Sequence, residues 1–567
     1  MTPILQINNF SLQIEQNEQW RPILNQVSFA LNRGEIIGIV GESGSGKSVT
    51  ALSVMRLLNE KKIKNSGEIL FNSQEAAPST NLLKVSHQEL RKIRGKEIAM
   101  IFQEPMTSLN PVIRCGEQIA ENILIHTSIS KKEAKDIVLK LLEEVLLPRP
   151  EKIYASYPHE LSGGQKQRVM IAMAMSCNPQ ILIADEPTTA LDVTVQKKIL
   201  ALIKELQQKY GMSVIFISHD LGVIAEIATR VLVMKKGEIV EVGTVEQILN
   251  HPQHPYTQGL IACRPPLDVR YRRLPTVEDY LSQKHVAPTI ISTAERAENH
   301  QQLYASQPLI RIEHLTKTYP LRKERWFEKR GYLHALQDIN LEVFEGETLG
   351  LVGESGCGKT TLGRTLLRLI EPTAGKVFYK DGELTQLSGA EMRRMRKEMQ
   401  IILQDPYSSL NQRMSIGAAI MEPMQYHKLY GSNKERKMRA IELLQRVGLE
   451  ESHFYRYPHE FSGGQRQRIG IARALAVNPK FIICDESVSA LDVSVQAQVL
   501  NLLNEIKREF HLTYIFISHD LSVVKFMSDR MAVMQAGHIV ELDDADKVYD
   551  HPQTEYTQQL IHSIPKI

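Results

Sequence analysis

Short apolar runs alternate with helical patterns along most of the chain. Runs such as "EIIGIV" (Glu35–Val40), "ILIAD" (Ile181–Asp185) and "SVIFI" (Ser213–Ile217) are short and bounded by polar residues, which is typical of buried strands. The stretches "SVTALSVMRLL" (Ser48–Leu58) and "QKQRVMIAMAM" (Gln165–Met175) are longer and predict helices. This pattern predicts an α/β fold.

The same order of elements occurs twice. "YPHELSGGQKQR" (Tyr157–Arg168) returns as "YPHEFSGGQRQR" (Tyr457–Arg468), 300 residues later. The glycine-rich segment Gly41–Ser48 returns at Gly353–Thr360, 312 residues later. The motifs follow the same order in both halves, and apart from this change of offset their spacing is the same. We therefore expect two whole domains rather than a short structural repeat. The predicted boundaries are 1–263 for the first domain with its tail, 264–308 for a linker and 309–567 for the second domain with its tail.

The predicted linker is rich in proline and arginine at its start, "RPPLDVRYRRLP", and mixed polar sequence follows. The run "RYRR" (Arg270–Arg273) is compatible with contact to phosphate or lipid. Short charge runs are more often solvated, so a solvated linker is the expectation.

The segments "GESGSGKS" and "GESGCGKT" each lie between a predicted strand and a predicted helix, which is the context of a P-loop. Backbone N–H groups of such a loop surround phosphate oxygens, and its lysine reaches the β- and γ-phosphates of ATP. The hydroxyls of Ser48 and Thr360 are candidate Mg²⁺ ligands. The predicted phosphate-binding residues are Gly41, Ser43, Gly44, Gly46, Lys47, Ser48, Gly353, Ser355, Gly356, Gly358, Lys359 and Thr360.

Acidic pairs end the apolar strands "ILIAD" and "FIICD". An aspartate at this edge, near a P-loop, is suited to hold Mg²⁺, which assigns Asp185 and Asp485. The following Glu186 and Glu486 are predicted to polarise the attacking water. For an isolated "DE" pair, a helix-capping acid is the commoner explanation. The repeated context favours the catalytic interpretation here.

Histidine and glutamine follow the other predicted strands. His219 and His519 come after "SVIFI" and "TYIFI", and they are candidates to contact the γ-phosphate and the water. Gln103 and Gln404 end "IAMIFQ" and "MQIILQ" and are candidates to contact both metal and nucleophile.

These motifs and the "LSGGQ" segment resemble the nucleotide-binding domains of ATP-binding cassette (ABC) proteins over nearly the whole chain outside the linker. The resemblance implies two tandem P-loop NTPase domains, each with a RecA-like core, an antiparallel β subdomain and a helical signature subdomain. The start of the helix after "SGGQ" offers free N–H groups to an anion. The resemblance implies that this second anion site serves the nucleotide of the facing domain. The signature residues are Ser162, Gly163, Gly164, Gln165, Ser462, Gly463, Gly464 and Gln465.

Two ATP molecules would then lie between two domains packed head to tail, an intrachain pseudo-dimer. Both halves keep the acid, the histidine and the signature, so we expect two hydrolytic sites. Ser487 replaces Pro187, which predicts a looser turn after Glu486. Tyr319 is a candidate to stack on adenine, although aromatic residues also favour strands for packing reasons. The aligned residue in the first half is Ile14, and Trp20 is a candidate substitute.

Composition constrains the partners. The net charge of +3 on 567 residues gives no independent case for nucleic acid or anionic lipid. The five cysteines are scattered and form no CxxC, which suits a reducing compartment. We identify no signal peptide and no apolar run near the ~18 residues that span a bilayer.

Further stretches resemble the motor subunits of oligopeptide/dipeptide importers, including the tails "HPQHPYTQGLIACRPP" and "HPQTEYTQQLIHSIP". The resemblance implies two membrane permease subunits, a periplasmic or surface solute-binding protein, and a peripheral position on the cytoplasmic face of the bacterial inner membrane, without nucleic acid. It leaves the cargo open among dipeptides, oligopeptides, glutathione, peptide antibiotics and nickel. Some such motors carry an iron–sulfur cluster on tail cysteines; with Cys263 alone, we expect none. The alternative is a soluble ABC-type ATPase acting on ribosomes or nucleic acid.

Overall fold

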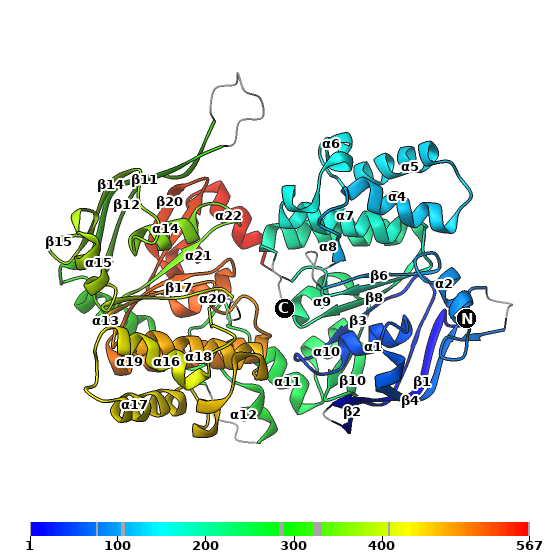
Figure 1. Ribbon diagram of the computed structural model, residues 1–567, viewed down its shortest axis with the longest axis horizontal. Coiled ribbons are helices and arrows are strands. Elements are labelled where there is room, and N and C mark those ends of the chain that lie inside the picture. Colours follow the sequence, from blue (N-terminus) through cyan, green and yellow to red (C-terminus); the bar gives the residue numbers. More distant parts are fainter. Residues whose placement is uncertain are drawn as a thin grey trace.

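The computed structural model describes residues 2–16, 18–74, 78–103, 108–189, 191–282, 288–321, 331–405, 407 and 409–564. Ala190 and residues 104–107, which follow Gln103, lie outside this described part. The two halves stand side by side, the first on the right of Figure 1 and the second on the left.

The centre of the first half is a six-stranded sheet with strand order β10-β9-β3-β8-β7-β6. Neighbouring strands are parallel except for the antiparallel pair of β9 and β10. Strands β3, β7 and β8 are buried along their whole length, which explains their continuous apolar sequence. The strands are β3 (Ile36–Val40), β6 (Ile98–Ile101), β7 (Ile181–Asp185), β8 (Ser213–Ser218), β9 (Arg230–Lys235) and β10 (Glu238–Thr244).

A second, antiparallel sheet covers one side of this core, in the order β2-β1-β4-β5. Its strand β1 alternates between buried and more exposed residues, as expected for a sheet with one face on the core. The pairing of β1 with β4 shifts register between Asn8 and Ser11. The strands are β1 (Leu5–Gln16), β2 (Gln19–Leu31), β4 (Ile63–Phe71) and β5 (Thr80–Asn81).

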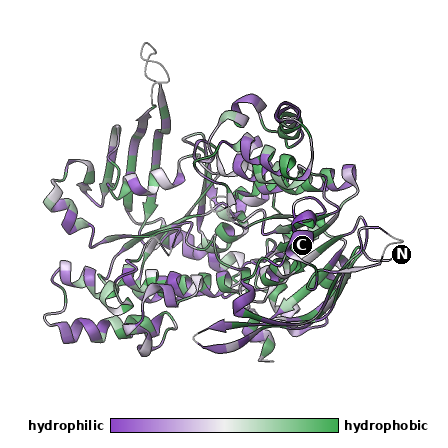
Figure 2. Cartoon of the chain, turned by 45° about the vertical axis from the view of Figure 1, so that its right-hand side comes forward, coloured by the Kyte–Doolittle hydropathy of each residue, from purple (hydrophilic) through white to green (hydrophobic). Residues whose placement is uncertain are grey.

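Helices complete the first half, and hydrophilic and hydrophobic residues are mixed along them in Figure 2. Helices α4 to α7 contact one another and form a separate helical subdomain. The helices are α1 (Lys47–Val54), α2 (His87–Ile93), α4 (Cys115–His126), α5 (Lys131–Glu144), α6 (Pro150–Ala155), α7 (Gly163–Met175), α8 (Val193–Tyr210), α9 (Leu221–Ile227), α10 (Val245–Asn250) and α11 (Pro255–Ala262).

The second half repeats this architecture, with sheets ordered β16-β17-β18-β13-β19-β20 and β12-β11-β14-β15. The predicted fold class is therefore confirmed for both halves. The strands are β11 (Pro308–Pro320), β12 (Tyr332–Phe344), β13 (Thr348–Val352), β14 (Ala374–Tyr379), β15 (Gly382–Glu383), β16 (Met399–Ile402), β17 (Phe481–Asp485), β18 (Thr513–Ile517), β19 (Arg530–Gln535) and β20 (His538–Asp544). The helices are α14 (Lys359–Leu366), α15 (Gly389–Met395), α16 (Ile416–Tyr426), α17 (Asn433–Arg446), α18 (Gly463–Leu475), α19 (Val493–Phe510), α20 (Leu521–Met527), α21 (Ala545–Asp550) and α22 (Glu555–His562).

The segment between the halves carries two helices, α12 (Val277–Leu281) and α13 (Thr293–Leu303), and binds the second half through ion pairs. The side chain of Arg270 is only 12% exposed and lies 2.7 Å from Asp546. Arg296 is 3.0 Å from Asp544, and His300 is 3.2 Å from the same carboxylate. The expectation of a solvated linker is therefore wrong for Arg270, because the second half supplies carboxylates opposite these cations.

This docking should weaken at alkaline pH. The neighbouring carboxylates of Asp529 and Asp544 raise the pKa of His300 from 6.5 to about 9. A raised histidine pKa adds stability below pH 6.5, and that stability is lost as the pH rises through about 9. We expect the melting temperature to fall more between pH 6.5 and 9 for the wild-type protein than for His300→Gln. Equal pH profiles in thermal unfolding would contradict this.

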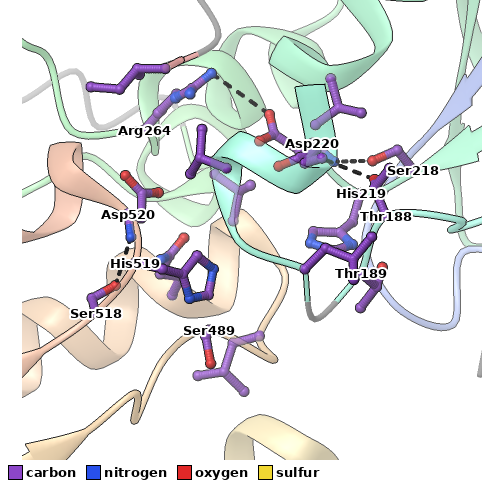
Figure 3. Close-up of a pocket in the computed structure, with 18 residues that line it drawn as sticks. Thr188, Thr189, Ser218, His219, Asp220, Arg264, Ser489, Ser518, His519 and Asp520 are labelled. Carbon is purple, nitrogen blue, oxygen red and sulfur yellow. Dashed lines mark hydrogen bonds and ion pairs between the residues drawn. The ribbon is translucent and has the colours of Figure 1, made fainter. Parts of the chain in front are cut away.

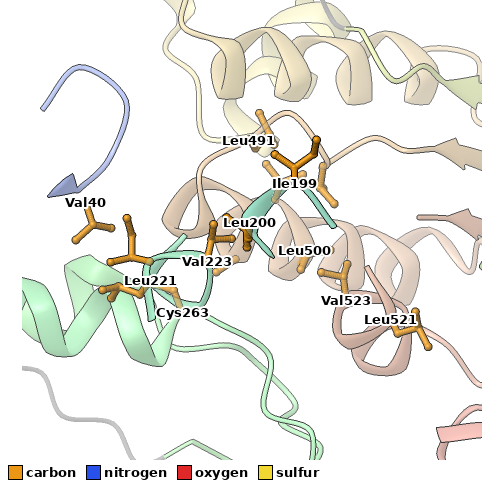
Figure 4. Packing of buried hydrophobic residues seen from close by; sticks show 14 of the residues in the cluster. Val40, Ile199, Leu200, Leu221, Val223, Cys263, Leu491, Leu500, Leu521 and Val523 are labelled. Atoms are coloured by element: carbon orange, nitrogen blue, oxygen red, sulfur yellow. The ribbon is translucent and has the colours of Figure 1, made fainter. Parts of the chain in front are cut away.

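The interface between the halves is continuous with their cores. Buried apolar side chains of both halves belong to one cluster (Figure 4). Members from the first half include Val40, Ile199, Leu200, Leu221, Val223 and Cys263, and members from the second include Leu491, Leu500, Leu521 and Val523. The halves therefore pack as a unit in this structure.

Candidate functional site

Each P-loop joins the central sheet to the first helix of its half. In the first half, the Nζ atom of Lys47 donates hydrogen bonds to the carbonyl oxygens of Gly41 (2.7 Å) and Glu42 (2.9 Å). Lys47 is 4% exposed, and burial lowers its pKa against the opposing charges of Glu186 and Asp492. Gly46 turns the chain into α1 at φ 103°, a conformation that L side chains rarely adopt.

The end of β7 brings the acidic pair against this loop. The hydroxyl of Ser48 donates to Asp185 at 2.9 Å. Burial raises the pKa of Asp185 to about 6; the Ser48 hydrogen bond opposes this shift and the neighbouring Glu186 charge adds to it. A hydroxyl and a carboxylate thus meet beside Lys47, as the sequence predicted.

Glu186 lies at the centre of a hydrogen-bonded group. Its Oε2 atom accepts from Gln103 (3.0 Å) and Thr189 (2.9 Å) and lies 3.2 Å from Nδ1 of His219. Burial would raise the pKa of Glu186, but the hydrogen bond and charge of His219, with help from Thr189 and Lys47, hold it at about 2. Residues predicted from three different strand ends therefore converge on one carboxylate.

The backbone of this glutamate is strained. Glu186 has φ 47° and Glu486 has φ 46°, in the left-handed region that favours glycine. Strained residues of this kind persist where surrounding structure enforces them, and they cluster at functional sites. The looser turn expected from Ser487 is not evident at Glu486, whose φ differs from that of Glu186 by one degree.

The second half repeats the arrangement with two differences. Thr360 donates to Asp485 at 2.9 Å, and Gln404 donates to Glu486 at 2.7 Å. The His519–Glu486 distance is longer, 3.7 Å. Ser489, the equivalent of Thr189, donates to the backbone oxygen of Glu486 rather than to its carboxylate. The carboxylates of Glu186 and Glu486 therefore differ in their hydrogen-bond partners and in their distance from the histidine.

The signature segments form the first turns of α7 and α18. Ser162 accepts from the backbone N–H of Gln165, whose side chain accepts from the Ser162 N–H, and Ser462 pairs with Gln465 in the same way. This capping box occupies the glutamine side chains, which the sequence analysis had assigned to nucleotide. In Figure 1, α7 and α14 occupy the upper part of the molecule on opposite sides of the interface, and α1 and α18 the lower part.

The halves touch at the P-loops through the segments that precede α8 and α19. Asp492 accepts a hydrogen bond from the backbone N–H of Ser43 at 2.7 Å, from one half to the other. Its counterpart Asp192 instead accepts from Val195 at the start of its own helix α8. Asp192 nevertheless lines a cavity with the P-loop of the second half. Each P-loop thus faces the other half.

That cavity has a volume of about 500 Å³ and gathers most of the second half's own predicted residues, but the facing signature residues Ser162, Gly163 and Gly164 do not line it. Tyr319 lines it on the β11 side, which keeps it a candidate for adenine stacking. In the first half, Lys64 lies 4.1 Å from the ring centroid of Trp20. The predicted residues that line the cavity are Tyr319, Ser355, Gly356, Gly358, Lys359, Thr360, Gln404, Glu486 and His519.

The two histidines also approach each other across the interface. His219 and His519 line a smaller shared pocket of about 100 Å³, with Asp220 and Asp520 beside them (Figure 3). At the strand ends, the hydroxyls of Ser218 and Ser518 accept hydrogen bonds from the backbone N–H groups of Asp220 and Asp520, each at 3.1 Å.

Sequence reasoning missed two kinds of residue at the site. Thr189 contacts Glu186 directly, and nothing in its local sequence marked it. Tyr256 and Tyr556, from the C-terminal tails, accept hydrogen bonds from the P-loop backbone, each at 3.0 Å. Their signal was present, because both lie in the repeated tail motif.

Comparison with known proteins agrees with this geometry. The family model described as "ABC transporter" matches residues 24–189 and 336–489. The model described as "Oligopeptide/dipeptide transporter, C-terminal region" matches 240–288 and 540–567. The second model therefore extends past residue 263 into the segment predicted as linker.

Curated relatives match almost the whole chain. The glutathione import ATP-binding protein GsiA of Escherichia coli (strain K12) is 47% identical over 99% of this chain and 89% of its own. The protein of the same name from Pectobacterium atrosepticum is 46% identical with the same coverage. A solved dimeric ATP-binding cassette, bound to ADP and Pi, is 29% identical over 42% of this chain and 98% of its own, with a TM-score of 0.38.

Within the described part of the chain, none of the helices combines the length and apolar character needed to cross a bilayer. The two family models cover the P-loops, the acidic strand ends and both tails. The chain belongs to the ABC transporter family, and it is an ATP-binding ATPase subunit of an ABC importer, with two ATPase domains fused in one polypeptide and an oligopeptide/dipeptide-type tail on each.

Proposed function

We propose that this ATPase powers uptake of small peptides, with glutathione as the first candidate, through two composite ATP sites. Support for the cargo comes from the relatives, which are named glutathione import ATP-binding proteins. Support for the composite sites comes mainly from one contact: Asp492 of the second half binds the P-loop of the first at Ser43.

The first site joins Lys47, Ser48, Gln103, Asp185, Glu186 and His219 to Ser462, Gly463 and Gly464. The second joins Lys359, Thr360, Gln404, Asp485, Glu486, His519 and Tyr319 to Ser162, Gly163 and Gly164. In each, the P-loop holds the phosphates, the signature N–H groups meet them from the facing half, and the glutamate orients water. The domain boundaries at 263 and 309 remain part of this proposal.

The donors beside each P-loop fit Mg²⁺. Ser48 and Asp185, and likewise Thr360 and Asp485, present a hydroxyl and a carboxylate within 2.9 Å of each other. Mg²⁺ binds oxygen ligands, commonly one or two carboxylates together with substrate phosphates. We assign it to Ser48, Gln103 and Asp185 in the first site and to Thr360, Gln404 and Asp485 in the second, where it would neutralise phosphate charge.

The mechanism begins with closure of the halves on the triphosphates. A proton acceptor works best with a pKa near the working pH, and the partners of Glu186 hold its pKa at about 2. We propose that closure loosens the 3.2 Å contact between His219 and Glu186, so that Glu186 takes a proton from water while His219 lies beside the phosphate. Separation of the charged products then reopens the halves.

The membrane partners would dock beyond Gln103 and Gln404. Residues 104–107, predicted to couple closure to the membrane, lie outside the described part of the chain. Apolar side chains are exposed on α4, on α16 and just before α4: Ile125 (69%), Tyr426 (63%) and Val112 (77%). We propose that these surfaces receive two permease subunits on the cytoplasmic face of the bacterial inner membrane, with a periplasmic or surface binding protein supplying cargo.

The test is reconstitution of the purified chain with its candidate permeases in liposomes, with binding protein outside. We expect glutathione or a dipeptide to stimulate ATP hydrolysis and to accumulate inside. Val112→Asp should lower uptake without lowering the basal hydrolysis of the free chain. Neither uptake nor stimulation with any peptide would favour a soluble ATPase acting without a permease.

A further inference from the structure

Both C-terminal tails bind the P-loop of their own half through a tyrosine. The backbone N–H of Glu42, the second residue of the first P-loop, donates to the hydroxyl of Tyr256 at 3.0 Å. The equivalent N–H of Glu354 donates to Tyr556, also at 3.0 Å. The two bonds link segments 214 and 202 residues apart and are the same in both halves.

The next backbone N–H of the first P-loop is bound by the other half. Ser43 donates to Asp492, which precedes α19. The backbone amides of Glu42 and Ser43 are neighbours in the chain. The first donates to the tail of its own half, and the second donates to the facing half. Asp492 also raises the pKa of Tyr256, after the larger effects of burial and of the Glu42 charge, so the two groups are neighbours.

Each tail also contacts a long helix of the other half. The first tail contacts α19, and the second contacts α8. Helix α11 contacts α19 of the second half. At the other end of the interface, Lys197 on α8 donates to the backbone oxygen of His562 in the second tail, at 2.9 Å. Each tail therefore contacts both its own P-loop and a helix of the facing half. That helix is the one that begins directly after Asp492 or Asp192.

The tails are firmly attached to their own sheets. Glu241 on β10 accepts from the backbone N–H groups of Gln253 (2.7 Å) and His254 (3.1 Å). Glu541 on β20 accepts from Gln553 (2.9 Å) and from the Thr557 hydroxyl (2.6 Å). These bonds fix the start of each tail on its own half, so the tyrosine hydroxyl has a set position beside the P-loop amide.

A need to satisfy a buried hydroxyl does not by itself explain these bonds. Buried tyrosines usually find some partner, and Tyr256 is fully buried. Tyr556, however, is only partly buried, so water is available to it, yet it binds the same P-loop amide. The shared feature is the amide, which lies beside the predicted phosphate-binding residues.

We propose that Tyr256 and Tyr556 are positioning residues for ATP hydrolysis, through which each C-terminal tail aligns its own P-loop with the facing half. This inference rests on the assignment of the two P-loops as ATP sites. It gives the repeated tail a role in the reaction. The tail contacts the facing half and holds the first residues of its own P-loop in place.

The test replaces both hydroxyls, in Tyr256→Phe combined with Tyr556→Phe. Phosphate alignment matters most in the transition state, so we expect kcat for ATP hydrolysis to fall about tenfold, with KM for ATP changing less than twofold. Tyr514→Phe is the matched control, because its hydroxyl donates to the buried Leu503 carbonyl at 3.2 Å, away from either P-loop. It should lower the melting temperature comparably but leave kcat unchanged.

Equal kcat values for the double variant and the Tyr514→Phe control would overturn the inference. If the double variant does not fold, Tyr556→Phe alone carries the test, since the partly exposed tyrosine tolerates the change, and unchanged kcat there is equally decisive. Failure of the ATP-site assignment has a different result: glutamate replacement at both sites would leave hydrolysis intact, whatever the tyrosine variants do.

Discussion

Replacing both site glutamates, Glu186→Gln with Glu486→Gln, should lower ATP turnover at least about 100-fold, the usual contribution of a general base. Glutamine keeps the size of the side chain and one acceptor oxygen, but its neutral amide accepts no proton from water. The P-loop bonds of Lys47 and Lys359 do not involve these carboxylates. We therefore expect ATP binding to be retained and the closed form to accumulate, measured by phosphate release and by retention of labelled ATP.

The single variants distinguish the sites. Glu186 accepts from Thr189 and Glu486 does not accept from Ser489, so unequal turnover of the two sites is expected. Glu205→Gln, an exposed acid on α8, is the control and should behave as wild type. Hydrolysis near the wild-type rate in the double variant would show that another group activates water.

Adjacent glycines of the second signature should respond in opposite ways. A Cβ on Gly463 would meet nothing within 4 Å, whereas a Cβ on Gly464 would lie 2.3 Å from Cγ1 of Val495. Gly463→Ala should therefore leave the melting temperature unchanged or higher, because alanine favours helix by ~1 kcal/mol. It should still lower hydrolysis more than about tenfold, because the methyl group stands where N–H groups approach phosphate.

Gly464→Ala should instead destabilise the second half by about 1–3 kcal/mol, the usual cost of overpacking. Val495 is branched at Cβ and has little rotamer freedom to move aside. Val495→Ala in the same chain should restore stability, which separates the packing defect from a defect in nucleotide contact. A loss of stability in Gly463→Ala equal to that in Gly464→Ala would contradict this division of roles.

The structure confirms the fold class, and its elements have local signals in the sequence. A strand followed by Gly41–Ser48, or by Asp185 and Glu186, carries its own context, and the duplication repeated each signal. The capping role of Gln165 also has a local signal, because Ser162 and Gln165 have the spacing of a capping box. The sequence analysis assigned Gln165 to nucleotide binding instead.

Contacts between distant segments could not be predicted in the same way. Ser43 and Asp492 are 449 residues apart, and Arg296 and Asp544 are 248 apart. Each of these residues alone is compatible with many surroundings, and only the packing of whole domains selects the partner. The local contacts of Thr189 and Ser489 also escaped prediction, because equivalent hydroxyls bind different acceptors, the Glu186 carboxylate and the Glu486 backbone oxygen.

The docked segment between the halves has a consequence for assembly. Ion pairs of Arg270 and Arg296 tie the described parts of residues 264–308 to the second half, so the connection between the two ATPases is held close to that half. A short connection gives an effective concentration of one half around the other in about the millimolar range. At cellular protein concentrations, each half therefore pairs with the other half of its own chain rather than with a half of another molecule. Two different ATPase domains are paired in this way without a separate assembly step.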